Sequence, residues 1–416
     1  MAILIRRWWD APLDVEGLAI DAVSEVVDAV ARLVRAQGRR TAVDTTSELV
    51  RAAFESVEHI RIGGRPLSPW AEMSGFFRAA DGHVRLHGNY PHHADAIRRT
   101  LGASSRSDVE AAIGGRPAHE VEDAIVAAGG VAAAVRSPAE WRDHAHERAT
   151  GHAPWAQIEP AGIRAVPRSD DAPLAGVRVL DLTRVIAGPA CAQLLACLGA
   201  DVLRVDPPHR PELPWQYLAS AMGKRSAVAD LGVRRDGIRA LLDRADVVLL
   251  GYRPGALDRF GLSPAQLAAD HPRLVVAALS AWGADGPWGA RPGFDSIVQA
   301  ATGIAVACAD ADGRPGALPV QALDFATGYR MAAGVVGLLA AGRAGLVRTS
   351  LVGAARTLLA AGPPPSGGSR SMDTPLVTAM SPDGPVVLPP PPVRLDGATL
   401  ARDAGGYGTA PLTWGG

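Results

Sequence analysis

Cysteine is scarce in this 416-residue chain, which has only three. Cys191, Cys197 and Cys308 form neither a C-x-x-C pair nor a cysteine–histidine pattern with metal-site spacing. The sequence therefore predicts reduced, buried thiols, a cytoplasmic location and no bound metal.

An excess of one charge sign and long apolar runs are also missing. Forty-two basic residues balance 43 acidic ones without a long run of one sign, so the composition gives no support to a nucleic-acid or anionic-membrane partner. The most apolar helical segment, 331–342, ends at Arg343 after about three turns, too short to span a bilayer. The apolar run before Arg6 is too short for a signal-peptide core. We expect no membrane partner.

The stretch 175–206 has the pattern of a strand, a turn, a helix and a second strand. Apolar runs at 177–182 and 202–205 lack polar alternation, which is typical of strands buried on both faces of a parallel sheet. Pro189 suits the first turn of the intervening helix. Asp206 closes the second strand, where a nucleotide-binding sheet often keeps a carboxylate for ribose.

A G-x-G-x-x-G fingerprint is absent from this unit, which disfavours an NAD-dependent oxidoreductase. The strand and helix alternation nevertheless continues, with strands predicted at 226–230, 246–251 and 273–280 and helices at 234–243 and 263–270. We predict the α/β class, with a parallel Rossmann-like sheet that carries helices on both faces.

The first part of the chain has a different pattern, from which we predict a smaller α+β domain. Residues 15–36 form an amphipathic helix, and Asp81-Gly82 is a hairpin turn between strands at 75–78 and 83–86. The predicted segments are a smaller domain with a returning helical part at 1–160, a linker at 161–174, an α/β domain at 175–361 and a proline- and glycine-rich tail, extended or partly disordered, at 362–416.

Three histidines stand close together at His87, His92 and His93, near Tyr90. No glutamate or cysteine stands at ligand spacing, and adjacent histidines before a helix are typical of a solvated cap. The pattern does not favour a metal site.

Several segments are more specific than their periodicity. They are PLAGVRVLDLTRVIAGPACAQLLACLGADVLRVDPP (173–208), GKRS (223–226), ADVVLLGYRPGALDRFGLS (245–263) and HPRLVVAALSAWGADGPWGARPGFD (271–295). Together they resemble the family III CoA-transferases, the group of the formyl-CoA and carnitine CoA-transferases and the alpha-methylacyl-CoA racemases. The resemblance implies a CoA-binding role for 175–361.

The order of the chain departs from that family. Segments 68–102 and 129–160 resemble the family's later portion but precede its opening, so the chain looks permuted, or derived from a fused tandem pair that lost its outer halves. The resemblance also implies a homodimer, because family members form interlocked rings.

Asp295 is the predicted catalytic residue. The resemblance aligns it with the aspartate of a G-[YF]-D segment that attacks acyl-CoA thioesters, and a carboxylate suits this work because its anhydride reopens readily. A purely structural alternative is that Asp295 caps the helix predicted at 296–308.

The resemblance also assigns CoA contacts. These fall on Val185 and Ile186 in RVIAGP, Lys224-Arg225, Gly251-Tyr252 and Arg259. Relatives usually carry asparagine where this chain has Gly251, and glutamine or leucine where it has Ile186. Cationic side chains of this kind suit the phosphates of CoA.

Asp324 stands where the racemase branch keeps a second catalytic aspartate, but the histidine partner of that branch is Phe294 here. A phenyl ring cannot move a proton, so the sequence favours a transferase over a racemase. Asp324 is then expected to cap a helix. The glycine-rich loop that covers the aspartate in transferases has no clear counterpart except Gly367-Gly368 in the tail. Loss of such donors typically costs roughly two to three orders of magnitude in rate.

The leading hypothesis is a CoA-transferase that moves CoA between an acyl-CoA and a carboxylic acid through a covalent aspartyl intermediate. Coenzyme A then acts as a substrate, and no separate cofactor is expected. The alternatives are a non-catalytic CoA-binding homologue, favoured by the permuted order and the missing loop, and an acyl-CoA racemase.

Overall fold

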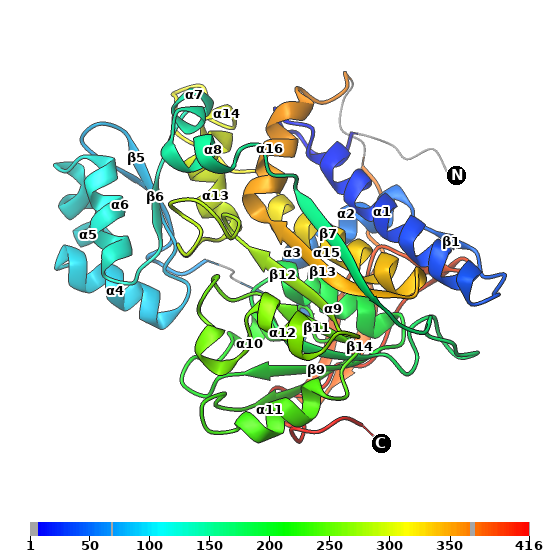
Figure 1. Ribbon diagram of the computed structural model, residues 1–416. Helices are drawn as coiled ribbons and strands as arrows, with labels where there is room; N and C mark the ends of the chain where they lie inside the picture. Colours follow the sequence, from blue (N-terminus) through cyan, green and yellow to red (C-terminus); the bar gives the residue numbers. More distant parts are fainter. Residues whose placement is uncertain (1–6, 68–69, 367–370, 416) are drawn as a thin grey trace.

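A seven-stranded, mostly parallel sheet forms the centre of the computed structural model, which describes residues 7–67, 70–366 and 371–415 (Figure 1). Six strands run parallel, and the edge strand β7 is antiparallel to its neighbour. This confirms the predicted α/β class. Across the sheet the strands are β10 (Lys224–Val228), β9 (Asp201–Asp206), β8 (Arg178–Leu182), β11 (Val247–Leu250), β12 (Val275–Ser280), β13 (Arg343–Ser350) and β7 (Ala156–Ile163).

Successive side chains of the central strands enter two different hydrophobic cores. In β11, Val247 and Leu249 face one core while Val248 and Leu250 face the other. Such complete burial explains why these strands read as continuous apolar runs. Helices therefore cover both faces, as predicted: α1 (Val15–Ala36), α9 (Ala187–Cys197) and α15 (Ala322–Ala340) on one, and α11 (Arg235–Leu242) and α12 (Pro264–Asp270) on the other.

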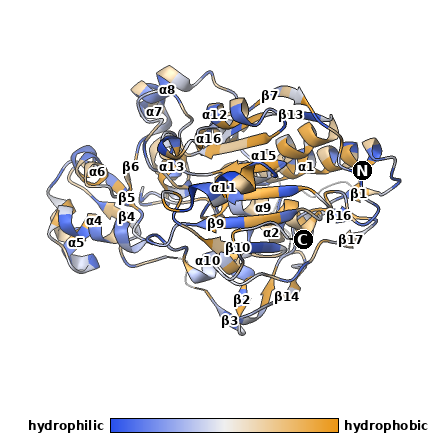
Figure 2. Cartoon of the chain, turned by 60° about the horizontal axis from the view of Figure 1, so that its bottom comes forward, coloured by the Kyte–Doolittle hydropathy of each residue, from blue (hydrophilic) through white to orange (hydrophobic). Residues whose placement is uncertain are grey.

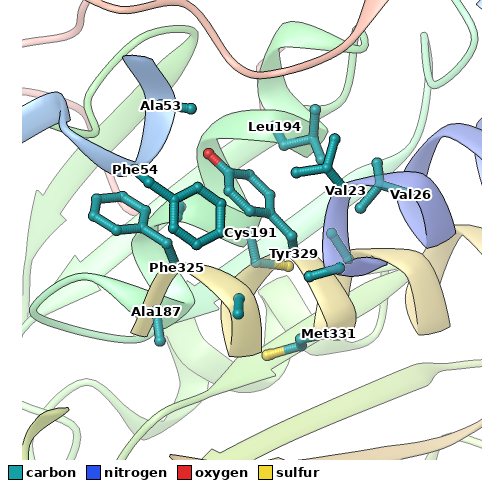
Figure 3. Packing of buried hydrophobic residues seen from close by; sticks show 14 of the residues in the cluster. Val23, Val26, Ala53, Phe54, Ala187, Cys191, Leu194, Phe325, Tyr329 and Met331 are labelled. Carbon is teal, nitrogen blue, oxygen red and sulfur yellow. The ribbon is translucent and has the colours of Figure 1, made fainter. Parts of the chain in front are cut away.

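Helix α15 is the centre of the larger core. It packs along α1 and α9, and it is buried along most of its length. Figure 3 shows Phe54, the last residue of α2 (Ser47–Phe54), beside two rings of α15. Its ring centroid lies 5.5 Å from that of Phe325 and 5.8 Å from that of Tyr329. Figure 2 shows the same concentration of hydrophobic residues on the sheet, α1 and α15.

The smaller domain occupies only part of the predicted segment 1–160. An antiparallel sheet with its own core lies to one side of the large sheet, whereas α1 packs on α15 (Figure 1). The predicted hairpin is confirmed, with Phe77 opposite Val84. The domain contains β4 (Gly75–Arg78), β5 (His83–Leu86), β6 (Ala132–Ala134), α4 (Pro91–Leu101), α5 (Arg106–Gly114) and α6 (Ala118–Ala127).

The C-terminal segment 371–415 is more closely packed than its composition indicated. Its backbone runs beside the edge strand β10, where the Gly405 and Ala410 amides donate hydrogen bonds to carbonyls of that strand at 3.2 and 2.8 Å. The Trp414 side chain is buried and donates to the Leu241 carbonyl at 3.0 Å. Covering an exposed strand edge requires backbone groups rather than an amphipathic repeat, so no periodic pattern marks this role.

The remaining elements connect these layers. Among the described residues, no helix combines the length and apolarity needed to cross a bilayer. The other elements are β1 (Val43–Asp44), α3 (Ser56–His59), β2 (Arg61–Ile62), β3 (Arg65–Pro66), α7 (Pro138–Arg142), α8 (Ala145–Thr150), α10 (Pro214–Leu218), η1 (Asp258–Phe260), α13 (Asp295–Thr302), α14 (Ile304–Ala307), α16 (Leu351–Ala361), β14 (Val377–Ser381), β15 (Gly384–Leu388), β16 (Arg394–Leu395) and β17 (Ala398–Thr399).

The Phe54 contact yields a stability prediction. Phe54→Ala should lower the free energy of unfolding by about 3–5 kcal/mol, because it removes a fully buried ring and leaves a cavity beside α15. Val233→Ala, at a side chain 78% exposed, should change it by less than about 0.5 kcal/mol. Urea unfolding followed by circular dichroism measures both. Equally small losses of unfolding free energy in the two variants would show that the Phe54 contact does not stabilise the core.

Candidate active site

Asp295 follows the loop that leaves β12 at the carboxyl edge of the large sheet. The loop comes close to the Trp282 side chain: a Cβ atom on Gly293 would lie 2.8 Å from the Trp282 indole nitrogen. Only glycine fits there without displacing the ring, so the G-F-D sequence has a local steric reason. Asp295 then becomes the first residue of α13.

The Asp295 carboxylate is fully buried and held from two sides. The Gln299 side-chain amide donates to Oδ1, and the Asp324 backbone N–H donates to Oδ2 at 3.0 Å. Asp324 lies in the first turn of α15, so the positive end of that helix dipole faces the carboxylate. The alternative of Asp295 as a helix cap is not observed, because Phe294 occupies the N-cap position of α13 and makes no side-chain cap bond.

Two buried carboxyl groups share this site. Burial raises the pKa of Asp295 to about 6, although the hydrogen bonds from Asp324 and Gln299 oppose the shift. Burial, followed by the charge of Asp295, raises the pKa of Asp324 well above its usual range. The expected capping role of Asp324 is not observed, since Gln321 is the N-cap residue of α15 and that helix has no side-chain cap bond.

A cavity of about 280 Å³ opens in front of Asp295. One wall comes from the turn before α9, where Val185 has a φ of 72°, a left-handed conformation that is rare and costly for a β-branched residue. The predicted contacts Val185 and Ile186 therefore meet Asp295 at one cavity. Its lining also includes Phe54, Trp70, Arg85, His87, Asn89, Trp215, Phe294, Ser296, Leu318 and Asp324.

The smaller domain also contributes to the cavity lining. His87 stacks on Phe294 with ring centroids 3.9 Å apart, and burial lowers the pKa of His87 to about 3, so its imidazole is neutral. Arg85 on β5 lines the same cavity. The sequence predicted His87 to be part of a solvated cap, whereas it is buried here, and no sequence pattern marked Arg85. Within the described ranges, no cluster of three or more His, Cys, Asp or Glu side chains is arranged to hold a metal ion.

A second, larger cavity of about 580 Å³ lies at the carboxyl ends of β11, β12 and β13. Tyr252 and Arg253 line it, directly after Gly251. Burial raises the pKa of the Tyr252 hydroxyl, which stays protonated. Arg259 follows on the same loop with an exposed side chain, its guanidinium 4.6 Å from the Phe260 ring centroid.

Lys224 and Arg225 are not at this edge. They begin β10 and pair with the amino-terminal part of β9. The Lys224 ammonium is completely buried 3.6 Å from Asp181, and burial lowers its pKa to about 8. Arg225 is paired with Asp201 at 2.8 Å. Both cations are therefore engaged within the fold, away from Tyr252.

A buried ionic network joins the two domains beside these cavities. Arg204 donates to both Asp206 oxygens at 2.6 and 2.9 Å and to Glu212 at 2.9 Å. Tyr90 of the smaller domain donates to Glu212 at 2.5 Å, and the Val185 amide donates to the other Glu212 oxygen at 3.1 Å. Asp206 is thus occupied by Arg204 rather than free for a ribose.

Comparison with known proteins relates the large domain to a family. Residues 174–371, slightly less than half of the chain, match the profile of CoA-transferase family III. This segment is therefore similar to that family. The match begins where the predicted resemblance begins and does not include 1–160, so the permuted origin of that part stays a prediction.

Named relatives cover a similar stretch. The probable fatty acyl-CoA transferase Rv3272 of Mycobacterium tuberculosis is 37% identical over 190 residues, 42% of this chain and 48% of the relative. Succinate–glutarate CoA-transferase of Agrobacterium fabrum is 34% identical over 194 residues, again 42% and 48%. A crystal structure of Rv3272 is 36% identical and covers 45% of this chain and 58% of its own, with a TM-score of 0.42. The chain spans about half the length of the curated relatives it matches.

The raised pKa of Asp295 predicts a pH-dependent stability difference. The folded protein holds this proton more tightly than the unfolded chain, so the contribution to stability is complete below about pH 4 and is lost as pH rises through about 6. Asp295→Asn cannot ionise and should therefore exceed wild type in free energy of unfolding by on the order of 1–3 kcal/mol at pH 7.5, and by much less near pH 4.

Asp236→Asn is the matched control, because Asp236 lies in the first turn of α11 but is exposed. Chemical unfolding at several pH values measures the difference. A constant offset between Asp295→Asn and wild type across this pH range would contradict the assignment.

Proposed function

We propose that the protein is a transferase that moves CoA between an acyl-CoA and a carboxylic acid, with Asp295 as the covalent nucleophile. The observation that carries this proposal is the buried Asp295 carboxylate, fixed by Gln299 and the start of α15 at a cavity in a domain similar to family III. With a pKa of about 6, Asp295 is mostly ionised at neutral pH, as a nucleophile requires.

The proposed chemistry needs no external base. A carboxylate oxygen of Asp295 attacks the thioester carbonyl, the carbon–sulfur bond breaks, and CoA thiolate leaves an acyl-aspartyl anhydride. Thiolate attack on the aspartyl carbonyl releases the first acid and forms an aspartyl-CoA thioester. The acceptor carboxylate attacks this thioester to give a second anhydride and free thiolate. The thiolate then takes the new acyl group and restores Asp295.

The binding of CoA is part of the same proposal. We assign its nucleotide to the larger cavity, with Tyr252 near the adenine and the cation of Arg253 near the phosphates. Arg259, which is exposed on the same loop and does not line the cavity, would contact the phosphates from outside it. Val185 and Ile186 would then border the path of the thiol toward Asp295. We do not include Lys224 and Arg225 in this CoA site, because Lys224 is paired with Asp181 and Arg225 with Asp201.

An acyl-CoA racemase is the second candidate, because Asp324 lies in the same cavity as Asp295. Its weakness is that Phe294 stands in the place of a histidine base and packs against the neutral His87. A homodimer, implied by the resemblance, and a cytoplasmic location, predicted from the scarce cysteines, remain proposals.

Asp295→Asn should abolish CoA transfer while CoA binding stays nearly unchanged, since the variant keeps the size of the side chain but loses the nucleophilic charge. Transfer of CoA from butyryl-CoA to a labelled acid, followed by chromatography, measures the first property, and equilibrium dialysis the second. Asp236→Asn should retain wild-type transfer. If Asp295→Asn remains active, the covalent scheme is wrong; exchange of the α-proton of the thioester without transfer would instead support the racemase.

Arg259→Ala should weaken CoA binding about ten- to a hundredfold, because a charge-assisted contact contributes roughly 1.5–3 kcal/mol. Arg225→Ala is the control, since that guanidinium is engaged by Asp201 at the other end of the strands. Calorimetric titration with CoA measures both. Equal losses in the two variants would show that the site is misplaced.

A further inference from the structure

Arg85 is a buried cation that forms no ion pair or side-chain hydrogen bond with another described residue, although the charge of Asp295 attracts it. The residue is only 8% exposed. Its guanidinium packs on two aromatic rings, 5.0 Å from the Trp70 ring centroid and 4.7 Å from the Phe76 ring centroid. Among the described residues, its Nε has no hydrogen-bond partner. Burying a charge without a compensating partner is costly, so a retained unpaired guanidinium is typical of a ligand site.

Two further unpartnered polar atoms line the same cavity. They are Nδ1 of His87 and the Ser296 hydroxyl, both buried and without a hydrogen-bond partner in the described part of the chain. Arg85, His87 and Ser296 come from β5, the turn after it and α13. Three such atoms around one cavity that contains Asp295 indicate a polar ligand group of the kind that accepts several hydrogen bonds.

The charges around the cavity restrict this ligand. Arg85 is the one cationic side chain in the described lining, and its pKa, lowered by burial to about 10, still leaves it charged at neutral pH. Glu55 and Glu58 also line the cavity, and Glu55 is already paired with Arg51 at 2.9 Å. Asp295 lines the same cavity and attracts Arg85, but its carboxylate accepts hydrogen bonds from Gln299 and Asp324. A single ligand carboxylate can therefore still accept hydrogen bonds from Arg85, whereas a second carboxylate on the same molecule meets only the like charge of Asp295, Glu55 and Glu58.

We propose that Arg85, with His87 and Ser296, binds the carboxylate of a short monocarboxylic acid beside Asp295 and disfavours dicarboxylates. The planar fork of arginine matches a carboxylate with two hydrogen bonds. The apolar walls, which include Phe54, Val185 and Leu318, accommodate a short alkyl chain, and about 280 Å³ is at the small end of ligand pockets. This inference rests on the proposed function, since it names the acid that the transferase would use.

The test is calorimetric titration of the full chain, without CoA, with sodium butyrate, butyramide and sodium succinate. Butyrate should bind at least about tenfold more tightly than either of the others, because only butyrate offers one charge and an apolar chain. Arg85→Gln should weaken butyrate binding at least about tenfold and leave butyrate and butyramide equivalent. Arg85→Lys, which keeps the charge but not the fork, should bind with intermediate affinity.

Arg106→Gln is the matched control. Its guanidinium also lies over a ring of the smaller domain, 4.4 Å from the Phe77 centroid, but it is paired with Glu110 and does not line the cavity. Butyrate binding should be unchanged in this variant. Circular dichroism checks that each variant folds. If Arg85→Gln does not fold, the butyrate affinity of Arg85→Lys relative to wild type tests the proposal instead.

Wild-type affinity for butyrate in Arg85→Gln, or no binding of butyrate by wild type, would overturn the site. Succinate binding as tight as butyrate binding would overturn the stated preference. Because the titration requires no turnover, its outcome is separate from the fate of the proposed function. Butyrate binding that depends on Arg85 in a protein without transfer activity would retain the site and reject the transferase. CoA-transfer activity in a protein whose butyrate binding does not depend on Arg85 would support the transferase and reject the site.

Discussion

A carboxylate without access to bulk solvent is the constraint on which the rest of this structure depends. Asp295 is kept in place by Gln299 and by the first turn of α15, and its position is therefore fixed by whatever fixes that helix. Helix α15 packs on α1 from the beginning of the chain and on α9 from the large α/β domain. Helix α1 thus supports the position of Asp295 without lining the cavity beside it.

The two domains meet at this carboxylate. His87 of the smaller domain stacks on Phe294, and Tyr90 donates to Glu212 in the network that also binds the Val185 amide. Val185, whose backbone is strained, and Phe294 both line one cavity, and these contacts support the two residues. Backbone strain at such a position requires support from its surroundings, which the Glu212 network provides.

The local sequence pattern was sufficient to predict the parallel sheet, the hairpin around Asp81-Gly82 and the position of Asp295 at the carboxyl edge of the sheet. Each of these features depends on residues that are close in sequence. Arg85 was not foreseen because a lone arginine on a strand looks solvated unless its tertiary neighbours are known. Lys224 was predicted from a basic motif that resembles a phosphate contact, and its ion pair with Asp181 was not foreseen because the two residues are distant in sequence. The close packing of the tail was missed because its contacts are made by backbone groups and by scattered side chains such as Trp414, which form no periodic pattern.

The most direct test of the central claim is chemical trapping of the aspartyl intermediate. The protein is incubated with butyryl-CoA and then hydroxylamine, and the peptide that contains Asp295 is analysed by tandem mass spectrometry. The account predicts an aspartyl hydroxamate at Asp295 that depends on butyryl-CoA and is absent from Asp295→Asn. Hydroxamate formation at another carboxylate such as Asp324, during active transfer and with Asp295 unmodified, would contradict it.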